Sequence, residues 1–299
     1  MSDRFLGQDI TPRTVLGDIT LIIPTLGRDL LMECLESVAT GCVWPARLIV
    51  VDQSSSAKVS SWVDEMSAIG INAGYLPSSE TGTAAATNRG IERVETCFLA
   101  VTHDDCIVAP DWLKSLHFQL LKNFETVVTG RVEPGGSGVT VSIKTSTIPE
   151  SYRKPLLKED VLFPNNFGCE RSVFSKVGLF DESYYLRFAE DNDWSYRALR
   201  AGVPIVYAPE VIVKHLDWRD NSRLIATYGA YARSQGGFFG KHLRRGDLFI
   251  ALRIAIGLVR GFYRWVRGIL SDDPIMIASG WYSMTKMPSG VIAGLRGRD

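Results

Sequence analysis

Three features of this 299-residue sequence predict an α/β fold built on a twisted, mostly parallel sheet flanked by helices. Short apolar runs at 19–23 and 48–51 are bounded by polar turns, which is typical of strands buried on both faces of a parallel sheet. Between these runs, apolar residues recur at helical spacing from 30 to 38. The apolar fraction of 45% and the charged fraction of 22% indicate a globular protein, which excludes disordered and fibrous classes.

The predicted elements alternate along the first 215 residues. The helix of the first βαβ unit is expected to end at Gly41, and Pro110 suits the first turn of a later helix, where no amide hydrogen is needed. Residues 133–163 lose the periodicity and predict a long irregular segment. The remaining elements are expected to be a helix after 56, a strand at 71–76, a helix at 83–94, a strand at 97–101, and helices at 172–177 and 191–201.

Acidic residues follow two of the predicted parallel strands. Asp52 ends the second strand, Asp104 and Asp105 follow a later one, and Pro24 and Thr25 end the first. Ligands of open α/β sheets bind beyond this edge, so we expect these residues in one crevice. Carboxylates there can hold a phosphate through a hard divalent cation such as Mn2+ or Mg2+. Each acid alone also fits a turn or a helix cap.

A second acidic cluster, formed by Glu190, Asp191 and Asp193, lies in the first turn of a predicted helix. The helix dipole stabilises negative charge there by about 0.5 kcal/mol, so this cluster also has a structural explanation. The residues alone therefore leave a structural and a catalytic role open.

Six segments between residues 19 and 202 follow one another in an informative order. They are ITLIIPT at 19–25, LIVVDQSSS at 48–56, TGTAAATNRGIE at 81–92, HDDCIVAPDWL at 103–113, NNFGCERSVFSKVGLFDE at 165–182 and AEDNDWSYRALRAG at 189–202. In this order they resemble the family 2 glycosyltransferases, which have the GT-A type of nucleotide-diphospho-sugar transferase fold. The resemblance implies an N-terminal extension at 1–17, a catalytic domain at 18–215 and a basic helical region at 216–299.

The resemblance implies a metal-dependent, inverting transfer from a nucleoside-diphosphate sugar to the hydroxyl of a glycan or lipid-linked acceptor. Asp105 would ligate Mn2+ or Mg2+, which stabilises the charge on the departing diphosphate. Asp191 would be the general base that takes the hydroxyl proton, Glu190 is the second choice, and Asp193 is assigned to helix capping. The residues expected to bind the nucleotide are Pro24, Thr25, Arg28, Asp52, Ser54, Asn88, Arg89 and Asp104.

Two histidines bear on the predicted metal site. Many members of the fold place a late metal ligand where this sequence has His215, and the alternative is a histidine in a turn. His103 stands where the family often has a further acid. Because imidazole suits zinc or transition metals better than Mg2+, we expect His103 to be a strand-end residue that faces the site.

The C-terminal region is basic, although the chain as a whole has no net charge: 14 basic and six acidic residues lie between 214 and 299. Segment 247–270 places four arginines on one helical stripe beside a broad apolar surface. This pattern predicts either a helix packed on the catalytic domain or an interfacial helix on an anionic membrane, and the nearby Trp and Tyr favour the membrane. No nucleic-acid-binding motif accompanies the charge. The arginines are Arg253, Arg260, Arg264 and Arg267.

The five cysteines are widely spaced and form no C-x-x-C pair, which argues against a disulfide framework and a zinc knuckle. Without a basic segment and an apolar core at its start, the sequence predicts no signal peptide. We therefore expect a cytoplasmic location, peripheral on the inner face of the cell membrane if segment 247–270 binds lipid. The alternatives are a sugar nucleotidyltransferase, which would need a glycine-rich phosphate loop, and a non-catalytic nucleotide- or lipid-binding module of the same fold.

Overall fold

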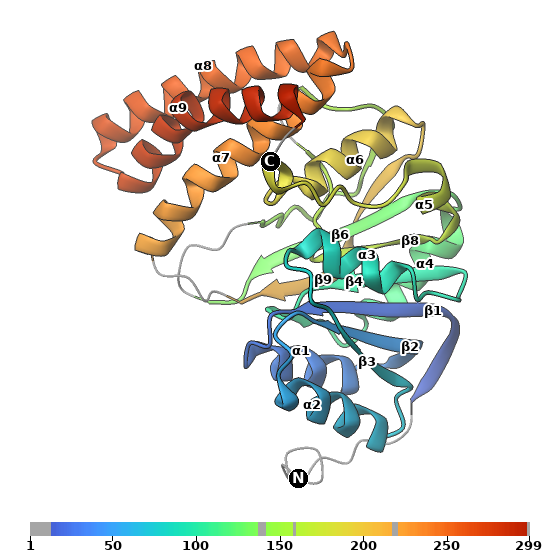
Figure 1. Cartoon of the computed structure of the whole chain (residues 1–299). Coiled ribbons are helices and arrows are strands. Elements are labelled where there is room, and N and C mark those ends of the chain that lie inside the picture. Colours follow the sequence, from blue (N-terminus) through green and yellow to red (C-terminus); the bar gives the residue numbers. More distant parts are fainter. Residues whose placement is uncertain (1–12, 137–141, 158–159, 217–220, 298–299) are drawn as a thin grey trace. The chain divides into compact units, whose positions relative to one another are not determined.

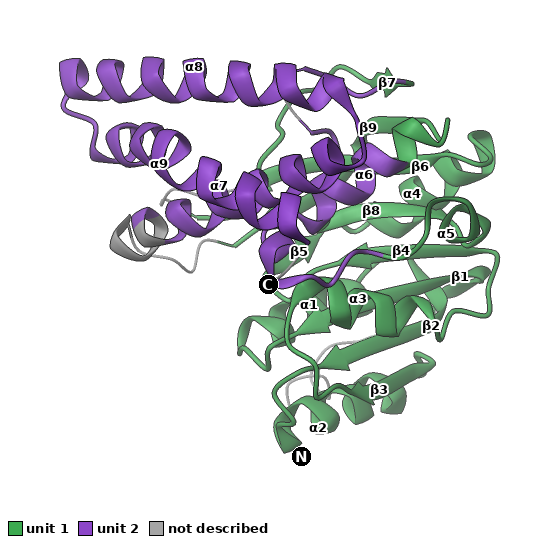
Figure 2. Ribbon diagram, turned by 45° about the horizontal axis from the view of Figure 1, so that its top comes forward, with its two compact units in different colours: residues 1–153, 162–179, 198–218 green, residues 154–161, 180–197, 219–299 purple. Residues whose placement is uncertain are grey.

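The computed structural model describes residues 13–136, 142–157, 160–216 and 221–297, and Figure 1 shows the chain. The chain divides into two compact units, coloured separately in Figure 2. Unit 1 is Met1–Arg153, Leu162–Leu179 and Ala198–Trp218; unit 2 is Lys154–Val161, Phe180–Arg197 and Arg219–Asp299. This division does not follow the linear boundaries expected at 17 and 215, because the segment with Glu190 and Asp191 belongs to the same unit as the C-terminal helices.

Unit 1 is built on a mixed sheet, whose described strands have the order β3-β2-β1-β4-β8-β6-β9-β5, with β7 beside β9. The pairs among β1 to β4 are parallel, whereas β8 runs antiparallel to β4 and β6, and β5 and β7 run antiparallel to β9. The predicted α/β class is confirmed, and the antiparallel pairs enter after the fourth strand. The strands are β1 (Thr14–Thr25), β2 (Val43–Asp52), β3 (Ala73–Pro77), β4 (Phe98–Thr102), β5 (Cys106–Val108), β6 (Val127–Pro134), β7 (Glu150–Tyr152), β8 (Asn166–Glu170) and β9 (Ile205–His215).

Alternate residues of β1 face opposite sides of the sheet, as the period of a strand requires. Ile19 and Leu21 belong to a core cluster that also includes side chains of α1, α2 and α4. On the opposite face, a Cβ atom on Gly90 of α3 would lie 2.5 Å from the side chain of Ile22, so only glycine allows α3 this close to the sheet. The helices of this unit are α1 (Leu30–Ala39), α2 (Ala57–Ala68), α3 (Thr83–Ile91), α4 (Trp112–Lys122) and α5 (Ser172–Val177).

The segment predicted to be irregular, 133–163, contains the end of β6 and the short strand β7. Lys144 forms an isolated antiparallel bridge to Val132, which ties part of this segment to the sheet. Within it, 137–141 and 158–159 lie outside the described residues.

Unit 2 is helical, and its long helices α7 and α9 are in close contact. A Cβ atom on Gly236 of α7 would lie 2.0 Å from the carbonyl oxygen of Met287, and one on Gly290 of α9 would lie 1.9 Å from that of Arg233. Glycine at these positions lets the two backbones touch. The elements are η1 (Tyr184–Leu186), the start of α6 (Glu190–Arg200), α7 (Asn221–Arg244), α8 (Leu248–Ser271) and α9 (Pro274–Arg296).

The four arginines of helix α8 differ in burial. Arg253 is buried, and its guanidinium donates two hydrogen bonds of 2.9 Å to the carboxylate of Asp160. Arg260, Arg264 and Arg267 are exposed. The four arginines have the spacing of one helical stripe, but a bidentate pair holds Arg253 inside unit 2, so Arg253 does not belong to its exposed part. Among the described helices, none is sufficiently long and apolar to span a membrane.

Candidate active site

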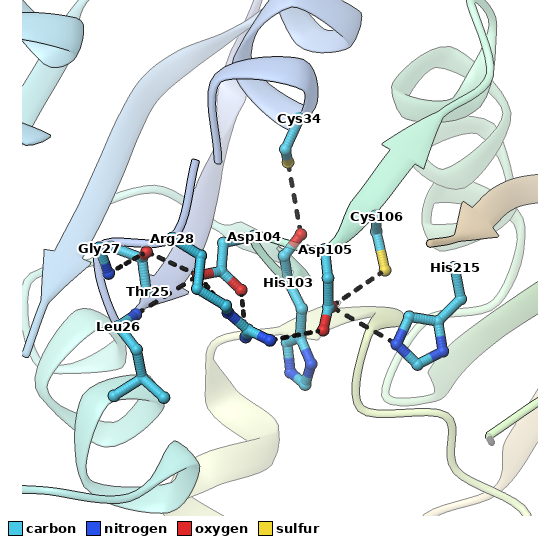
Figure 3. Close-up of polar contacts among 10 residues, drawn as sticks. All are labelled: Thr25, Leu26, Gly27, Arg28, Cys34, His103, Asp104, Asp105, Cys106 and His215. Carbon is cyan, nitrogen blue, oxygen red and sulfur yellow. Dashed lines mark hydrogen bonds and ion pairs between the residues drawn. The ribbon is translucent and has the colours of Figure 1, made fainter. Parts of the chain in front are cut away.

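The ends of three strands converge at one edge of the sheet in unit 1. Thr25 and Asp52 are register partners at the ends of β1 and β2. β1 also pairs in parallel with β4, which ends at Thr102. Asp104 and Asp105 follow that strand and lie beside Thr25 (Figure 3). The parallel pairing predicted from the sequence thus explains how residues distant in sequence meet.

Asp104 is fully buried and accepts hydrogen bonds from Thr25, which ends β1, and from Leu26 and Arg28, which follow that strand. The Thr25 hydroxyl donates to Oδ2 at 2.7 Å. Arg28 donates through Nε at 3.2 Å and Nη2 at 2.5 Å, and its Nη1 reaches Asp105 at 3.1 Å. Arg28 therefore bridges both acids and compensates their charge, which the sequence did not reveal because a side chain's partner is not encoded in local spacing.

Asp105 faces His215 across the antiparallel pair of β5 and β9. The register pairs His215 with Cys106, which brings Nε2 of His215 to 3.5 Å from Oδ1 of Asp105. Burial alone would raise the pKa of Asp105, but a hydrogen bond from His215, together with the charges of His215 and Arg28, holds this pKa well below its usual value. Asp105 is therefore ionised at neutral pH, which is the form that binds a cation.

The donor set around Asp105 fits a divalent transition-type metal. Ligand atoms of Asp105, Cys106 and His215 lie within 4.8 Å of one another. Burial raises the pKa of the Cys106 thiol well above its usual value, so Cys106 is uncharged and a weak ligand. A carboxylate oxygen together with an imidazole nitrogen suits Mn2+ better than Mg2+, which prefers oxygen ligands alone.

His103 faces the same site. Its ring lies on the same side as the guanidinium of Arg28 and the carboxylate of Asp105 (Figure 3). Burial lowers the pKa of His103 to about 4, so the imidazole is neutral. Within the described part of the chain, its buried Nε2 has no hydrogen-bond partner. A neutral imidazole with an unsatisfied nitrogen is a further possible ligand for a metal at Asp105.

Asp52 closes a turn at the end of β2. Its Oδ1 accepts hydrogen bonds from the amide of Ser54 at 2.8 Å and from the Ser54 hydroxyl at 2.6 Å. Its Oδ2 accepts from the amide of Ser56 at 3.2 Å and from the Tyr75 hydroxyl at 3.0 Å. The turn gives Asp52 and Ser54 a structural role. The nucleotide contacts expected of these two residues stay predictions. Tyr75 was missed because nothing in its strand pattern distinguishes it.

The other residues expected to bind the nucleotide lie on β1 and α3. Pro24 is the register partner of Val51 inside the sheet. Asn88 is buried on α3, and the neighbouring Arg89 donates through Nε to the carbonyl of Pro77 at 3.0 Å. This contact directs Arg89 to the end of β3, while its nucleotide contact and that of Asn88 stay predictions.

The predicted catalytic acids, Glu190 and Asp191, begin α6 in unit 2. Burial and the charge of Asp191 raise the pKa of Glu190 well above its usual value, and among the described residues its Oε2 has no hydrogen-bond partner. Burial, with a contribution from the negative charge of Asp160, raises the pKa of Asp191 to about 7. A carboxyl group with this pKa can accept a proton near neutral pH.

Asp193, which was assigned to helix capping, is instead the centre of a buried ion network. Its carboxylate accepts hydrogen bonds from Lys241 at 2.7 Å, His242 at 2.8 Å and Arg197 at 2.8 Å. Lys241 also contacts Asp181 at 2.7 Å. Although burial opposes ionisation, these donors hold the pKa of Asp193 well below its usual value. The network attaches the start of α6 to α7, two elements whose contact local spacing does not reveal.

A comparison with family models agrees with this geometry. The model described as Glycosyl transferase family 2 matches residues 20–178. This chain belongs to that family. The matched region includes Asp52, Asp104 and Asp105, whereas Asp191 and His215 lie beyond it.

Relatives of the family 2 chain include named glycosyltransferases. It is 24% identical over 211 residues to the O-antigen chain rhamnosyltransferase RfbN of Salmonella typhimurium, covering 66% of both chains. It is 26% identical over 206 residues to the pre-mycofactocin glycosyltransferase of Mycobacterium tuberculosis, covering 66% of this chain and 42% of that protein. The chain therefore matches about two thirds or less of the length of these relatives.

Solved structures show the same fold. The mannosyltransferase PcManGT from Pyrobaculum calidifontis, in complex with GDP-Man and Mn2+, aligns with a TM-score of 0.62 at 15% identity, covering 99% of this chain and 93% of that one. S. aureus TarS in complex with UDP-GlcNAc aligns with a TM-score of 0.55 at 13% identity, covering 94% and 92%. At these identities the likeness establishes the GT-A fold of the family 2 chain.

Proposed function

We propose that this chain is an inverting glycosyltransferase that moves a sugar from a nucleoside-diphosphate sugar to an acceptor hydroxyl. The observation that supports it most is the Asp104 and Asp105 pair at the carboxyl edge of the sheet, with Arg28 and His215 against it, in a chain of family 2. Structures of this fold bind such donors: PcManGT is in complex with GDP-Man and TarS with UDP-GlcNAc.

The donor diphosphate is proposed to bind at the edge formed by Asp104 and Asp105. Asp105 and His215 would hold Mn2+ there, with His103 beside them, and the bound ion would neutralise charge that develops on the leaving diphosphate. Arg28 supplies fixed positive charge at the same edge, and Asp104 orients it through two hydrogen bonds. The residues proposed to contact the nucleotide are Pro24, Thr25, Arg28, Asp52, Ser54, Asn88, Arg89 and Asp104.

The proposed transfer is a single displacement. The acceptor oxygen forms a bond to the anomeric carbon on the face opposite the diphosphate, while the bond from that carbon to the diphosphate oxygen breaks. The nucleoside diphosphate leaves with the electron pair, and Asp191 takes the proton of the acceptor hydroxyl. Because attack and departure occur on opposite faces, the configuration at that carbon inverts. Glu190 is the alternative base, and burial, together with the charge of Asp191, raises its pKa well above its usual value, which favours its protonated form.

Calorimetry of GDP and UDP binding, with and without Mn2+, tests the donor site. We expect binding that requires Mn2+ and that is lost in Asp105→Asn. The matched control is Asp111→Asn, which makes the same change at an exposed position and should leave binding unchanged. If neither nucleotide binds under either condition, the proposed function is wrong.

A screen of nucleotide sugars, scored by product, distinguishes the alternatives. A glycosyltransferase releases a nucleoside diphosphate from its donor, in part by slow hydrolysis when no acceptor is present. A sugar nucleotidyltransferase instead forms or consumes pyrophosphate, and a non-catalytic module binds nucleotide without turnover. Release of nucleoside diphosphate alone supports the proposal.

A further inference from the structure

Unit 2 contains a cavity of about 380 Å³ that no residue of the proposed mechanism lines. Its walls come from η1 and the residues after it, from α7 and from α9. Its volume is in the range of small-molecule sites and is sufficient for a monosaccharide with one charged substituent. We call it the η1/α7/α9 cavity, and the residues used below are Tyr184, Arg187, Phe188, Arg233, Tyr282 and Lys286.

The charged residues that line this cavity are all positive. Arg187, Arg233 and Lys286 line it, and none of its lining residues is acidic. Among the residues that the structure describes, these three have no ion-pair partner, although Arg187 lies 6.0 Å above the ring of Tyr184. The charge of Arg187 also acts on Glu190, whose pKa it lowers. Like charges that line one cavity repel one another, and an anion bound among them would reduce this repulsion. A phosphoryl group, with up to two negative charges and several acceptor oxygens, matches them better than a single carboxylate.

The aromatic residues of the cavity add a surface for an uncharged ring. Tyr184 and Phe188 are exposed, and the ring of Tyr282 rests against Gly229, where a Cβ atom would be 3.7 Å from it. Such rings present an apolar face that suits the C–H groups of a sugar ring, and the two tyrosines add hydroxyls that suit its O–H groups.

The residues that line the cavity are close in sequence to the proposed base, and a hydrogen bond connects the neighbours of both. Phe188 lines it and precedes Glu190 by two residues. Asn192, next to Asp191, donates to the side chain of Gln235 at 2.7 Å, and Gln235 follows Ser234, which lines the cavity. All of these residues belong to unit 2, so the relation does not depend on the donor site.

We propose that the η1/α7/α9 cavity binds a phosphoryl group carried by the acceptor glycan, and thereby holds an acceptor hydroxyl for Asp191. This inference rests on the proposed glycosyltransferase function, because it assigns the acceptor side of that reaction. The aromatic residues hold the acceptor sugar, and Arg187, Arg233 and Lys286 hold its phosphate. The phosphate belongs either to a soluble phosphoglycan or to the headgroup of a lipid-linked sugar.

Calorimetry on the full chain with hexose 1-phosphates, the matching methyl hexosides and a hexuronic acid tests the proposal. We expect the phosphates to bind and the methyl hexosides to bind at least about tenfold more weakly, since charge-assisted hydrogen bonds contribute about 1.5–3 kcal/mol. Arg233→Gln and Lys286→Gln should each lose about tenfold in phosphate affinity. Arg245→Gln, an exposed cation of unit 2 outside the cavity, is the control and should bind normally. Equal affinity for phosphates, methyl hexosides and the hexuronic acid overturns the proposal.

Competition separates this site from the donor site. With Mn2+ present, GDP or UDP should not displace the hexose 1-phosphate, and displacement would show that both occupy one site and overturn the proposal. If Mn2+-dependent nucleotide binding holds while no phosphate binds, the cavity proposal fails and the glycosyltransferase proposal stands.

Sedimentation with phosphatidylcholine vesicles, with and without a polyprenyl phosphate, identifies whether the phosphate belongs to a lipid-linked or a soluble acceptor. Vesicle binding that requires the polyprenyl phosphate and Lys286 indicates a lipid-linked acceptor, and binding of soluble phosphates alone indicates a phosphoglycan.

Discussion

Thr25 donates its hydroxyl hydrogen to the buried carboxylate of Asp104 at 2.7 Å, although 79 residues separate them. The contact joins the ends of two neighbouring parallel strands, and Arg28 bridges Asp104 and Asp105 beside it. The two acids are thus held in one arrangement by Thr25, which ends β1, and by Arg28, which follows that strand, before any ligand binds.

The Thr25 contact predicts a loss of stability on Thr25→Val, which keeps the shape and removes the donor. A buried carboxylate without one of its donors costs about 1–3 kcal/mol, so the free energy of unfolding should fall by that amount. Urea denaturation measures it. Thr285→Val, at an exposed position of α9, is the control and should change stability by less than about 0.5 kcal/mol. Equal effects of both substitutions would contradict a specific role for the Thr25 hydroxyl.

The raised pKa of Asp191 predicts a pH dependence of transfer. A general base must be deprotonated, so kcat/KM should rise with pH and level off above the pKa of about 7. Asp191→Asn should reduce transfer by about 100- to 10,000-fold and leave Mn2+-dependent nucleotide affinity unchanged. A pH profile that is the same in Glu190→Gln as in the parent assigns the titration to Asp191. Loss of nucleotide affinity in Asp191→Asn would show that this residue is a ligand.

The same pKa predicts an effect on stability. Because the folded-state pKa of Asp191 lies above the usual value of 3.8, the folded state holds the proton more tightly, and stability is lost as pH rises from about 4 to 7. Asp191→Asn should therefore be more stable than the parent at pH 8, and the difference should shrink toward pH 4. Thermal unfolding at both pH values measures it. Asp64→Asn, at an exposed position, should show no such trend.

The buried network around Asp193 predicts a large effect of Lys241→Met. This change removes the cation between Asp181 and Asp193, and leaving buried charge uncompensated costs about 3–5 kcal/mol. Denaturant unfolding measures it. Lys58→Met, which breaks the exposed pair with Asp29, should cost at most about 1 kcal/mol. A small effect at Lys241 would mean that the remaining donors to Asp193 compensate its charge.

We still predict that the exposed surface of α8 contacts an anionic membrane. Val259, Phe262, Tyr263 and Leu270 are exposed alongside the remaining basic residues of the stripe, which suits the surface of an anionic bilayer. Changing Arg260, Arg264 and Arg267 together to Glu should reduce sedimentation with anionic liposomes, and more so at low salt. Unchanged sedimentation would exclude this surface as the contact. Arg253 is unsuitable for this test, because it is buried against Asp160.

The strand ends and the acids that follow them were predictable because period and position are local properties. Apolar runs identified β1, β2 and β4, and their parallel pairing places Asp52, Asp104 and Asp105 at one edge. The order of the sequence segments also indicated the family, which the family match to residues 20–178 confirms.

Side-chain partners depended on packing between distant elements. Arg28 bridges two acids in the turn after β4, Asp193 meets Lys241 from α7, and Arg253 turns inward to Asp160. The η1/α7/α9 cavity likewise depends on tertiary structure, because its lining residues come from three elements that are separated in sequence. The sequence by itself determined which residues lie on which strand end and helix face, since hydrophobic periodicity repeats every few residues. Only the tertiary structure decided which charges meet, because that depends on contacts between elements far apart in the chain.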